Sequence, residues 1–436
     1  LMVECKNSEL KNPLWIDEDN IAVMQKIDNH WVLTRYSIST NKSTEIFKVN
    51  NGHLIAFDYS AKENLIAVTT ALSDGHHYID MLKPDGTLVS SHAITFPEDF
   101  PKLRHIRPMF SPLNKQLVFS SIRQIFTLSY DGKVSRTQLP IDFKIENPKF
   151  HPDGKRLLLI KMSYDSDIAL FPYAKVTNKP EADNLSNNQA RYSILERSTN
   201  SEENALFQPK GELIAYISER SGEDQLWTTN GNDTQLISAF ARNTLIRGFD
   251  WAADGKSMLV NANGTLTKVL LNRQTINYAL VHPVTRLFQW DSENKTALLM
   301  IRVDGISKFV ELNLYDEKFT VLSNKKIKWA QKSEDGRLIY SDKLDRFWQP
   351  GPIEDQLIEP LAGQGSFHRF VIKGNVIYGI NKDKQLWSYD LNKENFEVIT
   401  TLAENVDYLT DINQTHTLIE LNISAKKEVV ELSLSQ

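Results

Sequence analysis

The strongest constraint on this chain is a short pattern that it repeats along most of its length. The clearest copy is FQPKGELIAYISERSGEDQLW, from Phe207 to Trp227. An aromatic residue precedes a Pro/Gly turn, an apolar stretch of strand composition, a polar turn and a second strand, which together predict an antiparallel meander. A strand-rich unit that recurs roughly every forty residues is typical of a β-propeller, in which each unit forms one blade.

About ten copies of the unit can be located by an aromatic or apolar anchor that a turn and a strand follow. They begin at Pro13, Leu54, Arg107, Asn147, Phe207, Phe249, Leu287, Ile327, Phe367 and Val406. Alternation within each apolar run puts side chains on both faces of a small sheet, so neighbouring sheets cover one another. The aromatic anchors are expected to fill the interfaces between sheets. These anchors are Phe110, Phe150, Phe207, Trp251 and Trp290.

Ten units are more than the four to eight blades of common propellers. The ring is therefore unusually large, or the chain splits into two bodies, or terminal strands have been counted as blades. No Pro- or Ser-rich linker interrupts the spacing after Phe207, which favours one body. We predict a leading linker over residues 1–12 and, over 13–436, an all-β propeller of four-stranded antiparallel blades. The last strand, VVELSL at 429–434, is expected to meet the first unit and close the ring.

Composition excludes several classes of protein. The 41% apolar and 24% charged residues are typical of a globular chain, and no apolar run is long enough to span a membrane. A net charge of −5 without a basic segment argues against nucleic-acid binding by this part. The single cysteine, Cys5, excludes an internal disulfide and a multi-thiolate metal site. Because neither an initiating Met nor a signal peptide is visible, we expect a fragment of a longer protein.

The sequence contains no H-E-x-x-H, P-loop, dinucleotide-binding glycine pattern or EF-hand loop. The adjacent His76 and His77 would face opposite sides of a strand, so they do not form one chelating face. No metal ion and no cofactor are therefore expected.

Basic residues stand just before several anchor strands, where the chain enters a blade and turns toward the central channel. They are Arg104, His105, Arg107, Arg247, Arg286, His368 and Arg369. Projecting at the channel mouth, they would form a partly cationic ring suited to an acidic ligand or to a carboxylate of a partner. The alternative is that each lies on the outer rim, paired with a carboxylate of its own blade.

Four stretches carry a resemblance to a known repeat: FSPLNKQLVFSS, FHPDGKRLLLI, FQPKGELIAYISERSGEDQLW and WAADGKSMLV. They resemble the TolB-type propeller repeat, whose pattern is F-S-P-D-G-K, an apolar strand, S-x-R-x-G and a strand that opens with an aromatic. The resemblance covers nearly the whole chain and is strongest from Arg107 to Asp254. Such propellers occur as periplasmic interaction proteins, as a domain of prolyl-oligopeptidase-like enzymes, and as the sensory half of membrane-anchored winged-helix regulators similar to the CadC and ToxR type.

A peptidase of this kind would need a G-x-S-x-G nucleophile elbow, and the sequence contains none. We therefore expect a non-enzymatic sensory propeller, the periplasmic part of a bacterial inner-membrane transcriptional regulator, that binds a small ligand or a partner protein. Membrane contact would come only through a segment outside this chain. The alternative is a stand-alone soluble periplasmic TolB-like scaffold that acts by protein contact.

Overall fold

The computed structural model confirms an all-β chain. It describes residues 10–27, 30–50, 52–72, 76–97, 106–121, 124–137, 144–151, 153–172, 192–241, 244–303, 306–323, 325, 327–365 and 369–433. These residues form nine antiparallel sheets and one short 3-10 helix, Glu359–Leu361. No helix among them has the length and apolar character needed to cross a membrane.

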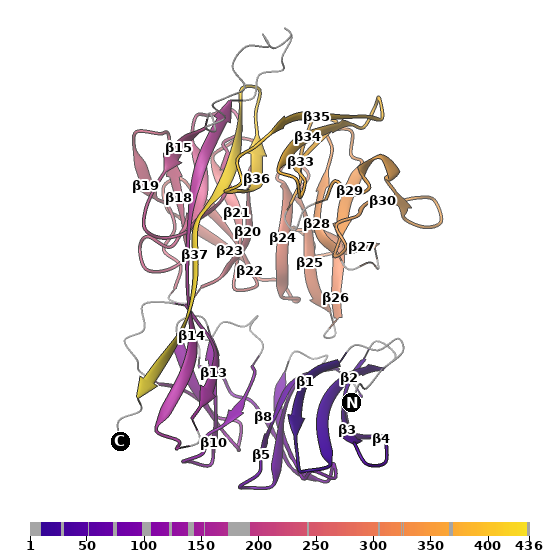
Figure 1. Cartoon of the computed structure of the whole chain (residues 1–436). Helices are drawn as coiled ribbons and strands as arrows, with labels where there is room; N and C mark the ends of the chain where they lie inside the picture. Colours follow the sequence, from indigo (N-terminus) through magenta and orange to yellow (C-terminus); the bar gives the residue numbers. More distant parts are fainter. Residues whose placement is uncertain are drawn as a thin grey trace. The chain divides into compact units, whose positions relative to one another are not determined.

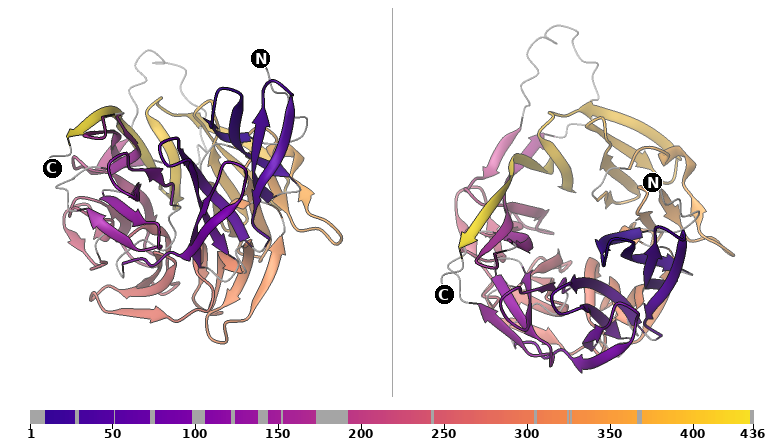
Figure 2. Two further views of the ribbon diagram at one scale, coloured as in Figure 1. Left: turned by 90° about the horizontal axis from the view of Figure 1, so that it is seen from below. Right: turned by 60° about the horizontal axis from the view of Figure 1, so that its bottom comes forward.

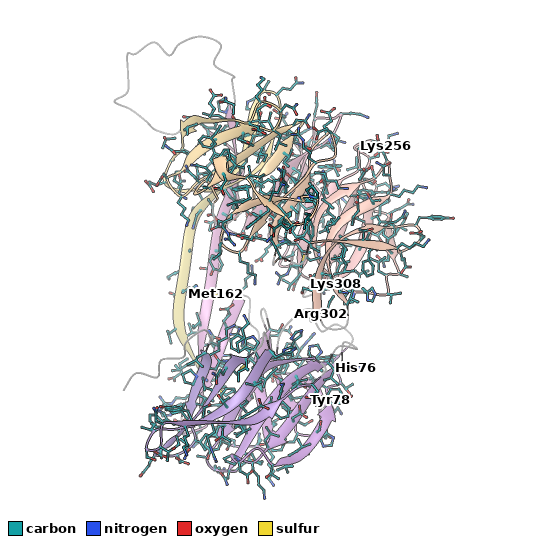
Figure 3. The ribbon with its side chains drawn as sticks, turned by 90° about the vertical axis from the view of Figure 1, so that its right-hand side faces the viewer. His76, Tyr78, Met162, Lys256, Arg302 and Lys308 are labelled. Carbon is teal, nitrogen blue, oxygen red and sulfur yellow. The ribbon has the colours of Figure 1, made fainter. Side chains whose placement is uncertain are left out.

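The chain divides into two compact units (Figure 1). The first unit comprises Leu1–Ser163, Val303–Ile306 and Lys426–Gln436, and the second comprises Tyr164–Arg302 and Ser307–Ala425. Two long strands, β14 (Arg156–Pro172) and β37 (His416–Ser433), each pass from one unit to the other. Met162, labelled in Figure 3, lies on β14 just before this passage. The regular spacing of the repeats favoured one body, and the division into two units contradicts that expectation.

The first unit contains three four-stranded sheets and part of a fourth, and each sheet contacts the next in chain order. Its strands, apart from its parts of β14 and β37, are β1 (Leu10–Trp15), β2 (Asn20–Ile27), β3 (His30–Ser37), β4 (Lys42–Lys48), β5 (Gly52–Ser60), β6 (Leu65–Leu72), β7 (His77–Leu82), β8 (Leu88–Ala93), β9 (Met109–Phe110), β10 (Gln116–Ser121), β11 (Gln124–Ser129), β12 (Val134–Thr137) and β13 (Lys144–Phe150).

The second unit contains five four-stranded sheets built from consecutive strands, and part of a sixth sheet. Apart from the end residues Val303 and Ile306, its strands are β15 (Ser193–Glu196), β16 (Glu202–Phe207), β17 (Ile214–Ser218), β18 (Gln225–Thr229), β19 (Thr234–Leu236), β20 (Ile246–Trp251), β21 (Ser257–Ala262), β22 (Thr265–Leu270), β23 (Thr275–Tyr278), β24 (Val284–Asp291), β25 (Thr296–Val303), β26 (Ile306–Asn313), β27 (Phe319–Ser323), β28 (Ile327–Lys332), β29 (Leu338–Asp342), β30 (Phe347–Gln349), β31 (Gln356–Leu357), β32 (Val371–Lys373), β33 (Val376–Ile380), β34 (Gln385–Asp390), β35 (Asn395–Thr401) and β36 (Val406–Ile412).

The sixth sheet closes the second unit into a ring. Its strands run in the order β15, β14, β37, β36, so two come from the start of the unit and two from its end. The innermost strands β16, β20, β24, β28, β32 and β36 contact one another in that order, and β36 contacts β16. The second unit is therefore a closed propeller of six blades, whose strands Figure 2 draws in magenta through orange to yellow around a common centre.

This closure explains why about ten sequence units become nine sheets. The units that begin at Asn147 and Val406 share one sheet, because β14 pairs with β37. The last strand was expected to meet the sequence repeat that begins at Pro13, and this expectation is wrong for the described residues, because β37 pairs with β14 and β36. In the first unit, β37 lies against β14: Glu431 is 3.4 Å from Arg156, and Val430 packs on the cluster that contains Leu157. The predicted boundary at residues 12 and 13 falls inside β1, which begins at Leu10.

Polar contacts link every pair of neighbouring blades in the second unit. Six contacts join the six blades into the ring. In four of them, the side chain that precedes the anchor residue, or the residue equivalent to it, accepts a hydrogen bond from the backbone N–H at the anchor position of a neighbouring inner strand. These bonds are Trp290 N to Asp250 Oδ2 at 2.8 Å, Lys332 N to Gln289 Oε1 at 2.7 Å, Ile372 N to Gln331 Oε1 at 2.7 Å and Phe207 N to Asp411 Oδ2 at 2.9 Å. The other two joints have Trp251 Nε1 donating to Leu206 O and an ion pair between Lys373 and Asp411. The first unit repeats the bond between Phe110 N and Asp58 Oδ2, at 2.8 Å.

Three of the expected anchors are buried between sheets. Phe110 packs with Ala67 and Ile79 of the preceding sheet, and Trp251 packs with Ala215 in the same way. Trp290 is also buried, whereas Phe150 and Phe207 keep partial exposure at the margins of their clusters. Because neighbouring blades cover both faces of each sheet, every residue of β17 is buried.

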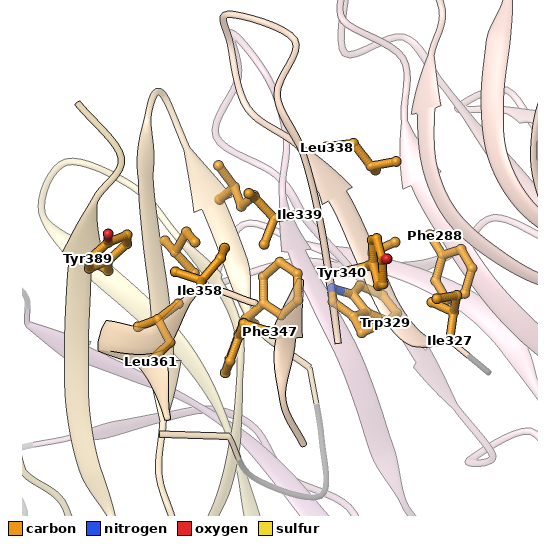
Figure 4. Close-up of a cluster of buried hydrophobic side chains, with 14 of the residues drawn as sticks. Phe288, Ile327, Trp329, Leu338, Ile339, Tyr340, Phe347, Ile358, Leu361 and Tyr389 are labelled. Atoms are coloured by element: carbon orange, nitrogen blue, oxygen red, sulfur yellow. The ribbon is translucent and has the colours of Figure 1, made fainter. Parts of the chain in front are cut away.

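The largest hydrophobic cluster of the second unit spans three consecutive blades (Figure 4). Phe288 meets Trp329 edge to face at 5.6 Å, and Phe347 meets Trp387 in the same manner at 5.7 Å. Gly379 lies against Trp387, and a Cβ on this glycine would come within 2.3 Å of the indole ring. The absence of a side chain at Gly379 therefore makes room for the most buried tryptophan of the cluster.

Gly379→Ala should lower the free energy of unfolding by about 1–3 kcal/mol, because the added methyl overpacks a rigid contact. Guanidinium unfolding followed by tryptophan fluorescence measures the change. Trp387→Leu in the same background opens space for the methyl, so the double variant should lose less than the sum of the two single variants. Strict additivity would show that the contact is not the cause.

Asp411→Ala should cost about 3 kcal/mol of unfolding free energy, because it leaves the Phe207 N–H and the Lys373 ammonium without their acceptor. The matched control is Asp316→Ala, whose carboxylate lies in an exposed turn and pairs only locally with Lys318. The control should change the free energy by less than about 1 kcal/mol. Equal losses in the two variants would contradict a role of Asp411 in ring closure.

Candidate functional site

The candidate site is a ring of side chains at equivalent positions on the inner strands of the second unit. Arg247 stands four residues before Trp251, and Arg286 stands four residues before Trp290. The same position holds Glu203 on β16, Lys328 on β28 and Tyr408 on β36. We call this set, together with Arg369 just before β32 and Glu420 on β37, the channel ring.

Arg286 is the centre of the cationic side of the channel ring. Its side chain remains exposed to solvent, and its Nη1 donates to the backbone oxygen of Lys328 at 2.8 Å. Desolvation by the surrounding protein and the positive charges of Arg247 and Arg369 lower the pKa of Arg286. A side chain that is accessible to water yet crowded by protein and by like charges is typical of a channel wall.

Trp329 joins two of these arginines. The guanidinium carbon of Arg286 lies 5.6 Å from the centre of the Trp329 ring, and that of Arg369 lies 5.3 Å from it. Both contacts are within the range of cation–π attraction. Phe288 packs edge-on against Trp329 and holds the indole in place. The hydrophobic cluster thus positions the two charges.

Arg369 carries donors that the described residues do not satisfy. Its Nε and Nη2 are buried and have no hydrogen-bond acceptor among the described residues. The guanidinium also lies 5.6 Å from the ring of Tyr408 and borders a small cavity of about 10 Å³, which Ser341 and Gln364 also line. Buried donors without acceptors are costly, so an added acceptor at Arg369 would be stabilising.

The opposite side of the channel ring is acidic. Glu420 is 6% exposed, and its Oε2 accepts the Asn204 N–H at 3.3 Å. Burial and the charge of Glu203 raise the pKa of Glu420 to about 8, although Tyr408 and Arg369 favour its ionised form. Burial and the charge of Glu420 also raise the pKa of Tyr408. Glu203 accepts a hydrogen bond from Ser201 Oγ at 3.0 Å.

Two further carboxylates lie close to the channel ring, and both belong to the joints between blades. Lys373 Nζ is 2.8 Å from Asp411 Oδ1, and although burial opposes its charge, Asp411 and Asp250 raise the pKa of Lys373. Burial raises the pKa of Asp250 to about 6, although the hydrogen bonds that it accepts from the backbone N–H groups of Trp290 and Trp251 lower it. These groups are committed to structure, and Lys328 of the channel ring pairs with Asp345, whereas Arg286 and Arg369 have no carboxylate partner among the described residues.

The structure brings together three of the seven residues predicted from sequence. Arg247, Arg286 and Arg369 share the channel ring of the second unit, and the hydrogen-bond acceptor of Arg286 is a backbone carbonyl rather than a carboxylate. Arg107 is an exposed residue of the first unit. Arg104, His105 and His368 lie outside the described residues, as does Cys5. The ligand-binding role of all seven stays a prediction.

Sequence reasoning missed the acidic side of the channel ring. Glu203 and Tyr408 occupy the same repeat position as Arg247 and Arg286, so an alignment of the units on their anchors would have found both. Glu420 gave no such signal, because it lies on a second strand and reaches the site only through the packing of β37 beside β36. Within the described part of the chain, no group of three or more His, Cys, Asp or Glu side chains could hold a metal ion.

Glu420→Gln should remove a pH dependence of stability. Since the folded-state pKa is about 8 and the ordinary value is 4.5, the folded protein holds a proton that the unfolded chain releases, and stability falls as pH rises between these values. The variant, which is neutral throughout, should match the wild type near pH 5 and exceed its unfolding free energy by about 4 kcal/mol at pH 9. Urea unfolding at both pH values measures this difference. The control Glu404→Gln, at an exposed position, should follow the wild type; a Glu420→Gln variant that also follows it would contradict the assignment.

No protein-family model matches the sequence, and no curated protein matches it. Among solved structures, a TolB protein from Agrobacterium tumefaciens matches 60% of this chain and 99% of its own length, at 11% identity and a TM-score of 0.45. The extracellular domain of a one-component system from B. thetaiotaomicron matches 94% of this chain and 70% of its own, at 12% identity and a TM-score of 0.32. The tricorn protease matches 90% of this chain and 44% of its own, at 11% identity and a TM-score of 0.27. These likenesses do not bear on function, and the propeller fold follows from the sheet order and contacts described above.

Proposed function

We propose that this chain is a non-enzymatic, ligand-binding sensory propeller, and that the channel ring of its second unit binds an anionic small molecule. The observation that carries the proposal is the gathering of Arg247, Arg286 and Arg369 on one side of the ring. Arg369 has buried donors without an acceptor in the described structure, and a carboxylate or phosphate would supply one. Like charges held together in this way favour an anion between them.

Two sequence features support a sensory rather than a catalytic role. The chain contains no G-x-S-x-G nucleophile elbow. Its repeat resembles the propellers of membrane-anchored regulators of the CadC and ToxR type, in which an extracytoplasmic domain passes its ligand state through a membrane helix. We infer a periplasmic location as the extracytoplasmic part of an inner-membrane regulator, with no nucleic acid bound by this part.

The second candidate is a stand-alone periplasmic scaffold that acts by protein contact. It is favoured by an exposed apolar area on the second unit, where Val281 is 81% and Tyr315 is 83% exposed. Beside Val281 lies a cavity of about 140 Å³ that Ile301, Leu312 and Phe319 line. Exposed apolar area next to a hollow is typical of a surface for protein contact.

Binding of anions to the purified chain tests the leading proposal. Succinate and inorganic phosphate serve as probes in isothermal titration calorimetry and thermal unfolding at low salt. At least one probe should bind, and Arg369→Gln and Arg286→Gln should each weaken its binding about tenfold or more, because each removes a charge-assisted donor. Arg273→Gln, in an exposed turn, is the matched control and should bind as the wild type does.

Binding that survives both ring variants would contradict the site, as would a failure of both probes to bind. The reading frame upstream of Leu1 then separates the two candidates. A winged-helix segment followed by about twenty apolar residues supports the sensor. A cleavable signal peptide directly upstream supports the scaffold.

A further inference from the structure

The channel ring carries charges of both signs on adjacent arcs. Arg247, Arg286 and Arg369 come from the blades of β20, β24 and β32, whereas Glu203, Tyr408 and Glu420 come from the blades of β16 and β36. Around the ring, β36 and β16 lie between β32 and β20. The acidic arc is therefore flanked on both sides by arginines.

Among the described residues, no side-chain ion pair joins the arginines of one arc to the carboxylates of the other, although the charge of Arg369 favours the ionised form of Glu420. The nearest acceptor of Arg286 is a backbone carbonyl, and Arg369 Nε and Nη2 have no acceptor among the described residues. In the described structure, no lysine or arginine forms an ion pair with Glu203 or Glu420. The partners of these two carboxylates are the Ser201 hydroxyl, the Asn204 N–H and Tyr408. The arginines therefore retain repulsion between like charges, whereas on the acidic arc burial and the charge of Glu203 keep Glu420 largely protonated near neutral pH.

A ligand with a single charge complements only one of the two arcs. An anion between the arginines adds negative charge near Glu203 and Glu420, and a cation between the carboxylates adds positive charge near Arg369. A ligand that carries a carboxylate and an ammonium group places a counter-charge in each arc and adds no net charge to the site. Electrostatic complementarity thus selects a dipolar ligand over either of its halves.

We propose that the channel ring binds a zwitterion of the amino-acid class, with its carboxylate against Arg286 and Arg369 and its ammonium group against Glu203 and Glu420. This inference rests on the proposed function of the same site and specifies its ligand. Tyr408, which lies between the two arcs and under the Arg369 guanidinium, borders both groups of the ligand. The exposed position of Arg286 provides access from the channel.

The test compares linear amino acids with their single-charge analogues by titration calorimetry at pH 7.5. The probes are glycine, 4-aminobutyrate and 6-aminohexanoate, the matched acids acetate, butyrate and hexanoate, and the matched amines methylamine, butylamine and hexylamine. At least one amino acid should bind ten times more tightly than both its acid and its amine. Glu203→Gln and Glu420→Gln should each weaken that amino acid about tenfold without weakening the matched acid. Arg369→Gln should weaken both, and the control Arg273→Gln neither.

Proton exchange gives a second readout that folding defects do not mimic. An ammonium group beside Glu420 favours the ionised carboxylate, so the amino acid should release protons on binding in weakly buffered solution at pH 8. The release should be absent in Glu420→Gln. Proton uptake with the amino acid would overturn the proposed orientation.

The outcomes separate this inference from the proposed function. Matched acids that bind as tightly as the amino acids would overturn the zwitterion and leave the anion site standing. Amines that bind as tightly as the amino acids would overturn both. Absence of binding by all nine probes, together with succinate and phosphate, would also overturn both.

Discussion

The second unit depends on one recurrent bond between its blades. The edge of each inner strand that faces the channel has no partner strand, so its N–H groups need another acceptor. Asp250, Gln289, Gln331 and Asp411 supply that acceptor from a neighbouring blade, always to the anchor N–H. A side-chain acceptor of fixed length sets the height of each inner strand relative to the next. The blades therefore share a common register around the channel rather than merely stacking on apolar faces.

That common register is what turns a repeated sequence position into a site. When the anchor residues of all blades lie at one level along the axis of the propeller, the residues four positions earlier also share a level. Residues at that position on different blades therefore become neighbours: Glu203, Arg247, Arg286 and Tyr408. The hydrophobic cluster below them adds rigidity, because Phe288 fixes Trp329, which in turn lies against the guanidinium groups of Arg286 and Arg369. The guanidinium groups of Arg286 and Arg369 are thus held in place by packing against an aromatic ring.

Closure of the ring is a separate event with its own requirement. Five blades fold from consecutive strands, but the sixth needs β36 and β37 to pair with β14 and β15. Thr417 Oγ1, for example, lies 3.4 Å from the Phe171 carbonyl oxygen, 246 residues away in sequence. A contact between residues so distant in sequence costs loop-closure entropy, and the contacts of the whole second unit have to offset that cost. Formation of the sixth blade is therefore expected to be late and cooperative in folding. Asp411 then joins the last inner strand to the first through Phe207 N, with the same kind of bond that joins three other pairs of blades.

The amino-acid pattern alone was sufficient for local features: strands, turns, buried anchors such as Phe110 and Trp251, and the two arginines, Arg247 and Arg286, that share one repeat position. These features follow from residue periodicity, which neighbouring residues carry. Residue periodicity does not show which strand an edge strand pairs with, because β14 and β37 each follow the first strand of a different sequence unit. Their pairing, reached only in the folded chain, converts ten apparent units into nine sheets, divides the chain into two bodies and closes one of them at six blades. The same pairing carries Glu420 to the channel ring, where burial changes its charge state. The position and charge state of Glu420 therefore depend on long-range strand pairing, which a repeat pattern does not encode.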